Sequence, residues 1–130
     1  MSDKKIAIFG STGSIGTQAL EILQNRKNLF DVDVLTANNN YEDLAEQVNT
    51  FHPSCVVLAN QEHKKEFQEL LNYTPEYLAF GQSALEEVAE NHDYDLLLNS
   101  LVGFAGFMST YTALKRRKKV ALANKESLVV

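Results

Sequence analysis

The 130-residue sequence has little of several features that would mark other classes of protein. Its single cysteine, Cys55, allows no disulfide within the chain and suits a reducing compartment. Lys and Arg (12) are outnumbered by Asp and Glu (17), and the net charge of −5 argues against general binding to nucleic acid or anionic membranes. No apolar run approaches the roughly 20 residues of a membrane span. There is no internal repeat and no linker rich in Pro, Gly or Ser.

The composition that remains is that of one globular domain. Hydrophobic residues make up 45% of the chain, enough for a core of its own. A strand-like run starts at residue 5, so we expect no signal or transit peptide and a cytoplasmic protein. The final residues, 124–130, resemble the first turns of a helix, which indicates the front part of a longer protein.

Short apolar runs alternate with amphipathic segments along the whole chain. Strands are predicted at 5–9, 31–37, 55–59, 76–80, 94–100 and 119–124. In the first helix the apolar residues Ile15, Ala19 and Ile22 predict the buried face, and Asn40 with Asp43 predicts the cap of the second. Six strands alternating with helices predict an α/β protein with a doubly wound, Rossmann-like parallel sheet, in the strand order 3-2-1-4-5-6.

The segment GSTGSIG, residues 10–16, joins the first predicted strand to the first predicted helix. In such sheets ligands bind beyond the carboxyl ends of the strands, where the free N–H groups of a helix N-terminus favour an anion. Gly10, Gly13 and Gly16 would let the backbone approach a phosphate closely. The loop therefore predicts a dinucleotide pyrophosphate site, with a tight turn that binds no ligand as the alternative.

The second predicted strand ends in Asn38, Asn39 and Asn40, where NAD-binding proteins usually carry an acidic residue. Neutral amides donate hydrogen bonds and do not repel a 2′-phosphate, so this pattern favours NADP over NAD. The alternative is that the three asparagines form only a turn and a helix cap.

Two further strand ends carry candidate residues. Gly103 and Gly106, in NSLVGFAG, would allow either close approach of a cofactor or close packing of a helix on a strand. In ANKES (123–127), Asn124 and Glu126 fit the start of a helix, whereas Lys125 does not, because a cation is unfavourable in a first turn.

The remaining reactive side chains are interpreted structurally. His52, His63 and His92 have no metal-ligand spacing with one another or with Cys55, and are interpreted as surface or loop residues. Cys55 opens an apolar strand and is expected to be buried rather than reactive. The basic run 115–119 is interpreted as a solvated helix end that complements the helix dipole.

Taken together, GSTGSIG, NSLVGFAG and LANKESLV resemble the 1-deoxy-D-xylulose 5-phosphate reductoisomerase family over essentially the whole chain. The resemblance implies an NADPH-dependent rearrangement and reduction to 2-C-methyl-D-erythritol 4-phosphate, in non-mevalonate isoprenoid biosynthesis. It implies that Thr12, Gly13, Ser14 and Ile15, within the loop that Gly10 begins, hold the pyrophosphate. Family members often have a Gly and a basic residue where this chain has Asn38 and Asn39.

The resemblance also implies roles for the other candidate residues. Asn38, Asn39 and Asn40 would lie near the adenosine ribose and its 2′-phosphate. Asn124 and Glu126 would lie at the nicotinamide end, and Lys125 would contact the keto sugar phosphate substrate.

On the same resemblance, residues 1–130 are the NADPH-binding domain of a longer enzyme, a homodimer when full length. Its divalent metal site (Mg or Mn), its lid and its C-terminal helical domain would follow residue 130, so this chain alone is expected to be inactive. Two alternatives stay open: the nucleotide-binding domain of an aspartate-semialdehyde-type dehydrogenase, and a non-catalytic dinucleotide sensor.

Overall fold

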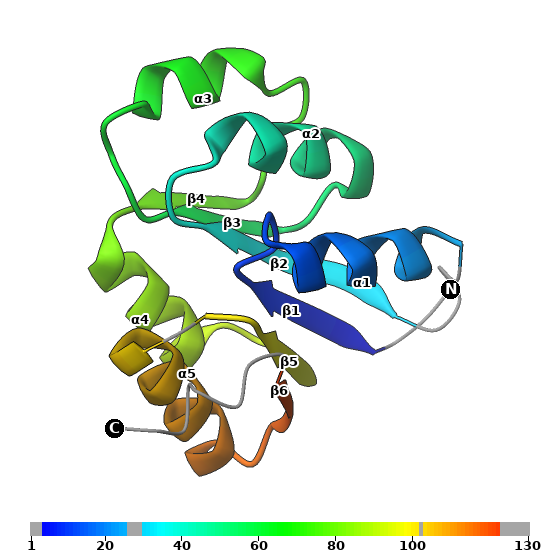
Figure 1. Ribbon diagram of the computed structural model, residues 1–130, viewed down its shortest axis with the longest axis vertical. Helices are drawn as coiled ribbons and strands as arrows, with labels where there is room; N and C mark the ends of the chain where they lie inside the picture. Colours follow the sequence, from blue (N-terminus) through cyan, green and yellow to red (C-terminus); the bar gives the residue numbers. More distant parts are fainter. Residues whose placement is uncertain (1–3, 26–29, 102, 123–130) are drawn as a thin grey trace.

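A computed structural model describes residues 4–25, 30–101 and 103–122, in which strands and helices alternate (Figure 1). Its elements are β1 (Lys5–Phe9), α1 (Ser14–Gln24), β2 (Asp31–Ala37), α2 (Tyr41–Phe51), β3 (Cys55–Leu58), α3 (Lys64–Leu70), β4 (Tyr77–Phe80), α4 (Gln82–Asn91), β5 (Leu96–Asn99), α5 (Gly103–Lys115) and β6 (Lys119–Leu122). The predicted elements are therefore confirmed, with β3, β4 and β5 one to three residues shorter; residues 123 and 124 of the last predicted strand lie outside the described residues.

All six described strands are parallel and form a single sheet in the order β4-β3-β2-β1-β5-β6. The α/β class and the parallel sheet are confirmed, but the predicted order 3-2-1-4-5-6 is wrong. β4 pairs with β3 and extends the first half of the sheet, so the order reverses between β4 and β5 instead of between β3 and β4. β1 consequently lies beside β5, where the predicted order placed the fourth strand, and Phe9 is opposite Asn99.

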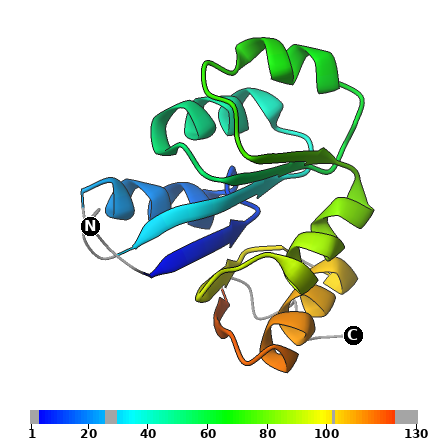
Figure 2. The same cartoon turned by 180° about the vertical axis from the view of Figure 1, so that it is seen from behind.

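The helices divide between the two faces of the sheet: α1, α2 and α3 cover one, α4 and α5 the other (Figures 1 and 2). This explains the position of β4. Because a right-handed crossover on the same face moves the chain in the same direction, α3 carries it one strand beyond β3. α3 buries Phe67 against the same core as α1 and α2. Alternate residues of β1 serve the two cores: Ile6 and Ile8 on one face, Ala7 and Phe9 on the other.

The buried face of α1 differs from the prediction by one position. Gly16, Leu20 and Leu23 are buried, whereas Ile15 and Ile22 are 43% and 60% exposed. The two sets have the same i, i+4, i+7 spacing, so periodicity alone does not separate them. The buried set contains Gly16, which lets α1 approach the preceding loop closely and so rotates Ile15 out of the core.

Cys55 is fully buried at the start of β3, as predicted. Burial raises the pKa of its thiol to about 12, with a smaller contribution from Asp33, and so keeps the thiolate unpopulated at neutral pH. Among the residues described, no helix combines the length and the hydrophobicity that a membrane crossing requires.

Candidate functional site

A pocket of about 430 Å³ opens at the carboxyl ends of β1, β2 and β5. It brings together eight of the ten predicted cofactor-binding residues, along with two that the sequence did not single out. Its lining is Gly10, Thr12, Gly13, Ser14, Ile15, Asn38, Asn39, Asn40, Ser100 and Leu101. The other predicted site residues, Asn124, Lys125 and Glu126, lie outside the described residues.

The first glycine of the loop has a conformation that other residues rarely adopt. Gly10 has a φ of +79°, and a Cβ added there would lie 2.5 Å from the Oγ of Ser100. That hydroxyl is within hydrogen-bond distance of the carbonyl oxygens of Phe9 (2.7 Å) and Gly10 (2.9 Å). Ser100 thus joins the end of β5 to the glycine loop, and Gly10 provides the space for it.

The first turn of α1 faces this pocket without a side-chain cap. Gly13 is the N-cap residue, and no side chain accepts a hydrogen bond there within the described residues. The N–H of Thr17 donates to the carbonyl of Gly13 (2.9 Å), so the helix begins with N–H groups that have no intrahelical acceptor. Ser14 and Ile15 belong to that turn and line the pocket. Amides without an intrahelical acceptor and the positive end of the helix dipole favour an anion at such a turn.

Gly16 is required for packing rather than for contact with a ligand. A Cβ at this position would lie 2.7 Å from the carbonyl oxygens of Gly10 and Ser11 and from the Cα of Ser11. By contrast, a Cβ at Gly13 would lie 3.6 Å from its nearest described neighbour, the carbonyl oxygen of Gly10. The three glycines therefore serve different purposes: a positive φ at Gly10, an open approach at Gly13 and close helix packing at Gly16.

The three asparagines after β2 are all exposed at the edge of the pocket. Asn40 caps α2: its Oδ1 accepts from the N–H of Asp43 (3.2 Å), as predicted. Asn39 is held by Asn60, whose Nδ2 donates to the Oδ1 of Asn39 (2.6 Å) and whose N–H donates to the carbonyl of Asn38 (2.9 Å). Within the described part of the chain, the side-chain NH₂ group of Asn39 has no acceptor of its own, so it can serve as a donor at the pocket.

Sequence reasoning missed Ser100, Leu101 and Asn60. Each follows a buried strand at its carboxyl end, which is the signal that could have found them. A second, mainly apolar pocket of about 280 Å³ adjoins the first and shares Asn38, Ser100 and Leu101 with it. The first turn of α1 and an apolar recess therefore lie side by side at the carboxyl ends of the strands.

The start of α5 is fastened to β5 by a buried amide. The Nδ2 of Asn99 donates to the carbonyl of Gly106 (2.8 Å) and to the Oγ1 of Thr110 (2.9 Å), and its Oδ1 accepts from the N–H of Leu101 (3.0 Å). Of the two sequence interpretations of Gly106, this contact supports helix packing. Gly103 is the first residue of α5.

The paired titratable side chains lie outside this pocket. In the described ranges, no group of three or more His, Cys, Asp or Glu residues could hold a metal ion. His63 pairs with Glu66 at 2.9 Å, and this hydrogen bond raises the pKa of His63. His92 is more than a loop residue, because it pairs with Asp33 at 2.8 Å.

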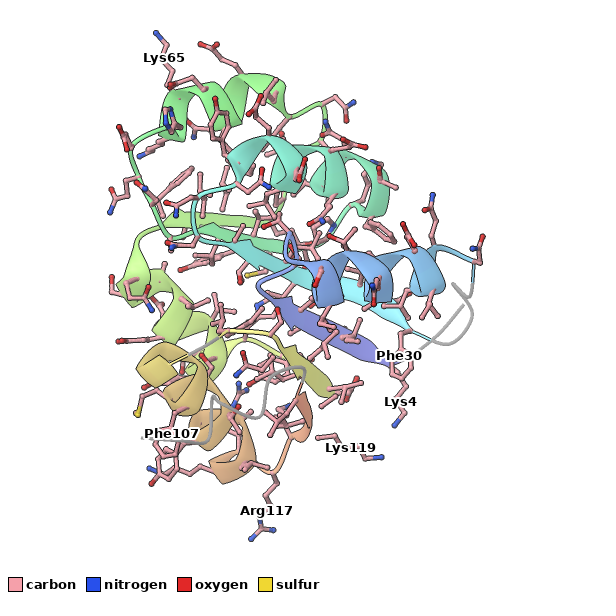
Figure 3. The ribbon with its side chains drawn as sticks, in the orientation of Figure 1. Lys4, Phe30, Lys65, Phe107, Arg117 and Lys119 are labelled. Atoms are coloured by element: carbon pink, nitrogen blue, oxygen red, sulfur yellow. The ribbon has the colours of Figure 1, made fainter. Side chains whose placement is uncertain are left out.

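The basic run is only partly the solvated helix end that was predicted. Arg117 and Lys119 point outward into solvent (Figure 3). Arg116, however, turns back and donates to the carbonyls of Ala89 (2.7 Å) and His92 (2.9 Å), which ties the end of α5 to the end of α4.

Comparison with known proteins adds to this geometry. The model of one protein family, 1-deoxy-D-xylulose 5-phosphate reductoisomerase, matches residues 6–130. The chain is 46% identical over 127 residues to the reductoisomerase of Phocaeicola vulgatus, covering 98% of this chain and 33% of that protein. It is 41% identical over 126 residues to that of Thermoanaerobacter pseudethanolicus, covering 97% of this chain and 32% of the relative.

Solved structures agree with the sequence matches. The reductoisomerase of Zymomonas mobilis in complex with NADPH superimposes with a TM-score of 0.87 at 34% identity, over 97% of this chain and 33% of that one. A reductoisomerase in complex with NADPH, fosmidomycin and magnesium superimposes with a TM-score of 0.84 at 31% identity, over 97% and 31%. The chain thus spans about a third of the length of these relatives.

Proposed function

The chain belongs to the 1-deoxy-D-xylulose 5-phosphate reductoisomerase family, and we propose that residues 1–130 are the NADPH-binding domain of such an enzyme. The observation that carries this proposal is the pocket at the N-terminus of α1, which gathers eight predicted cofactor-binding residues from loops far apart in the sequence. The complex of the Zymomonas mobilis relative with NADPH supports the same assignment.

The pyrophosphate would lie against the first turn of α1. Thr12, Ser14 and Ile15 would bind it through their backbone N–H groups, since the helix has no side-chain cap competing for them within the described residues. The N–H of Gly13 donates to the carbonyl of Gly10 (3.3 Å), so Gly13 would hold the phosphate by allowing its close approach. Gly10 would shape the turn, because its φ of +79° is inaccessible to most side chains. These residues therefore fit a dinucleotide phosphate.

The asparagines after β2 would face the adenosine ribose and its 2′-phosphate. Asn39 would donate from the NH₂ group that its bond with Asn60 leaves free, and Asn38 lies on the wall shared with the apolar recess. Asn40 already caps α2 through its Oδ1, so its role toward the cofactor is the smaller one. No carboxylate stands at this position to repel a 2′-phosphate, which favours NADPH over NADH.

The reaction proposed for the full-length enzyme is the rearrangement and reduction of 1-deoxy-D-xylulose 5-phosphate to 2-C-methyl-D-erythritol 4-phosphate. NADPH supplies the hydride, and a divalent metal ion (Mg or Mn) supplies Lewis acidity toward the substrate oxygens. We propose that the metal ligands lie in the two thirds of the relatives' length that this chain does not span. Asn124 and Glu126 would border the nicotinamide and Lys125 would contact the substrate; these roles, the homodimer and the cytoplasmic location stay predictions.

Calorimetric titration of residues 1–130 with NADPH and NADH tests the cofactor assignment. We expect saturable binding of both, tighter for NADPH, and no reductoisomerase turnover with added Mg or Mn. Turnover by this chain would overturn the division of labour, and failure of both cofactors to bind would overturn the assignment itself. The family match removes the support for an aspartate-semialdehyde-type dehydrogenase. The alternative of a non-catalytic sensor predicts that the chain binds the cofactor and that the protein has no longer form with activity.

A further inference from the structure

Gln47, on α2, reaches across to the loop that precedes α1. Its Nε2 donates to the carbonyl oxygen of Ser11 (3.0 Å), and its Oε1 accepts from the Oγ of Ser11 (2.7 Å). Ser11 is fully buried and belongs to the glycine loop, but it does not line the pocket. A single side chain from another element thus holds both the hydroxyl and the carbonyl group of one loop residue.

The Ser11 hydroxyl donates its one hydrogen bond to the Oε1 of Gln47. The Oγ of Ser11 is also 3.2 Å from the carbonyl oxygen of Thr36, but a hydroxyl has only one hydrogen to donate. That carbonyl already accepts from the N–H groups of Gly10 (3.1 Å) and Ser11 (2.8 Å). The shorter bond to Gln47 therefore takes the proton, and both bonds between Gln47 and Ser11 are formed at once.

The bond to the Ser11 carbonyl sets the direction of the next amide. The Ser11–Thr12 peptide is trans, so the N–H of Thr12 points opposite to the carbonyl of Ser11. Gln47 holds that carbonyl on the side of α2, and the N–H of Thr12 consequently points away from α2. Thr12 lines the pocket, so its amide orientation bears on any anion bound there.

We propose that Gln47 is a positioning residue that holds the Ser11–Thr12 peptide, and with it the phosphate-binding amides, in the orientation that binds the cofactor. This inference rests on the proposed function, because it concerns the same pocket. It assigns Gln47 no contact with the cofactor. Its effect is therefore common to NADPH and NADH, which share the pyrophosphate.

Two variants separate the parts of the contact. Q47L removes both hydrogen bonds at similar side-chain size, whereas Q47E keeps an acceptor for the Ser11 hydroxyl but loses the donor to the Ser11 carbonyl. Q18L on α1 is the matched control, since Gln18 is exposed and forms no hydrogen bond among the described residues. We would measure NADPH and NADH affinities by calorimetry, and amide hydrogen exchange of residues 10–16 by mass spectrometry without cofactor.

In Q47L and Q47E we expect the Kd of both cofactors to rise by about tenfold, with an unchanged ratio between them. Exchange of residues 10–16 should accelerate by a similar factor, while Q18L stays like the wild type in both measurements. If Q47L does not fold, the cofactor affinity and the amide exchange of Q47E test the proposal. Wild-type affinity in Q47E, or weaker binding with unchanged exchange, would overturn the proposal. A wild-type chain that binds neither cofactor would contradict the proposed function, and the exchange data alone would then decide the role of Gln47.

Discussion

Polar groups lie at both ends of the parallel strands, but their partners differ between the amino edge, where the strands begin, and the carboxyl edge, where they end. At the amino ends of the strands, Asp33 accepts hydrogen bonds from His92 (2.8 Å) and Ser54 (2.8 Å), and Arg116 donates to the carbonyl of His92. At the carboxyl ends, the first turn of α1 and the amide of Asn39 present donors toward a pocket. The groups named at the amino edge bond to one another, whereas those named at the carboxyl edge line a pocket.

The comparison separates polar groups that stabilise the fold from polar groups that line the pocket. Burial by itself would raise the pKa of Asp33, but the hydrogen bonds from His92 and Ser54, together with the charges of His92 and Lys5, outweigh it, and the pKa is lowered overall. That carboxylate is thus stabilised by partners within the chain. Among the described residues, the first turn of α1 at the carboxyl edge has no side-chain partner of this kind, so substitutions at the two edges should have different consequences.

The largest expected effect is that of G16A, at the carboxyl edge. A methyl group there would lie 2.7 Å from three backbone atoms, which cannot rotate away, so we expect a loss of about 3 kcal/mol in the free energy of unfolding. NADPH affinity should fall with it, because the loop must shift. Urea unfolding and calorimetry measure the two effects.

G13A is the matched control for this prediction. Its methyl group would have a nearest described neighbour at 3.6 Å, and the φ of −73° suits alanine, so stability should remain within about 0.5 kcal/mol of the wild type. Equal destabilisation by G13A and G16A would show that the two glycines do not have separate purposes.

The next effect concerns cofactor choice at Asn39. With donors but no positive charge, the wild type should prefer NADPH over NADH by roughly ten- to hundredfold. N39R should increase this ratio, and N39D should erase or reverse it, because a charge at this position acts on the 2′-phosphate that only NADPH carries.

Parallel titrations of both cofactors against the wild type and these variants measure that ratio. Asn25, at the C-terminal end of α1, provides the control: N25R adds the same charge at the opposite edge and should leave the ratio unchanged. Equal NADPH affinity of the wild type, N39R and N39D would mean that position 39 does not face the phosphate.

At the amino edge, D33N should lower the free energy of unfolding by about 2 kcal/mol at pH 7 without changing NADPH affinity. The pKa of Asp33 is lowered in the folded state, so its contribution is present above the unfolded pKa and is lost as the pH falls through the folded pKa. The difference between the wild type and D33N should therefore shrink on acidification and vanish below the folded pKa of Asp33.

Urea unfolding across the acidic range measures this dependence. D93N is the matched control, because the Asp93 side chain is 78% exposed and its ion pairs with Lys5 and Lys118 are screened by solvent. A loss in D93N as large as that in D33N would contradict the assignment of the stabilising role to the Asp33–His92 pair.

The smallest effect is expected for Y94F, also at the amino edge. The buried hydroxyl of Tyr94 donates to the carbonyl of Ala89 (3.0 Å), which also accepts from Arg116 (2.7 Å) and so keeps a partner in the variant. We expect a loss of about 1 kcal/mol in unfolding free energy and no change in NADPH affinity. A change in affinity would show that the two edges are coupled.

Much of this arrangement follows from the sequence. Apolar periodicity placed every strand and helix, because the contacts that define an element lie within a few residues. The carboxyl ends of parallel strands meet at one edge of the sheet, so the sequence alone predicts that the glycine loop and the three asparagines belong to one site. Family-specific residues then pointed to the reductoisomerases.

What the sequence by itself determined is therefore the element order, the parallel α/β class and the residues at the carboxyl edge. Only the tertiary structure decided that β4 extends the sheet beyond β3, that Gly16 instead of Ile15 faces the core, and that His92 pairs with Asp33. It alone revealed that Gln47 holds Ser11. The two side-chain contacts join residues 36 and 59 positions apart, the strand order depends on the pairing of whole strands, and the buried face of α1 depends on the rotation of the helix about its axis. Local periodicity carries no information about any of these.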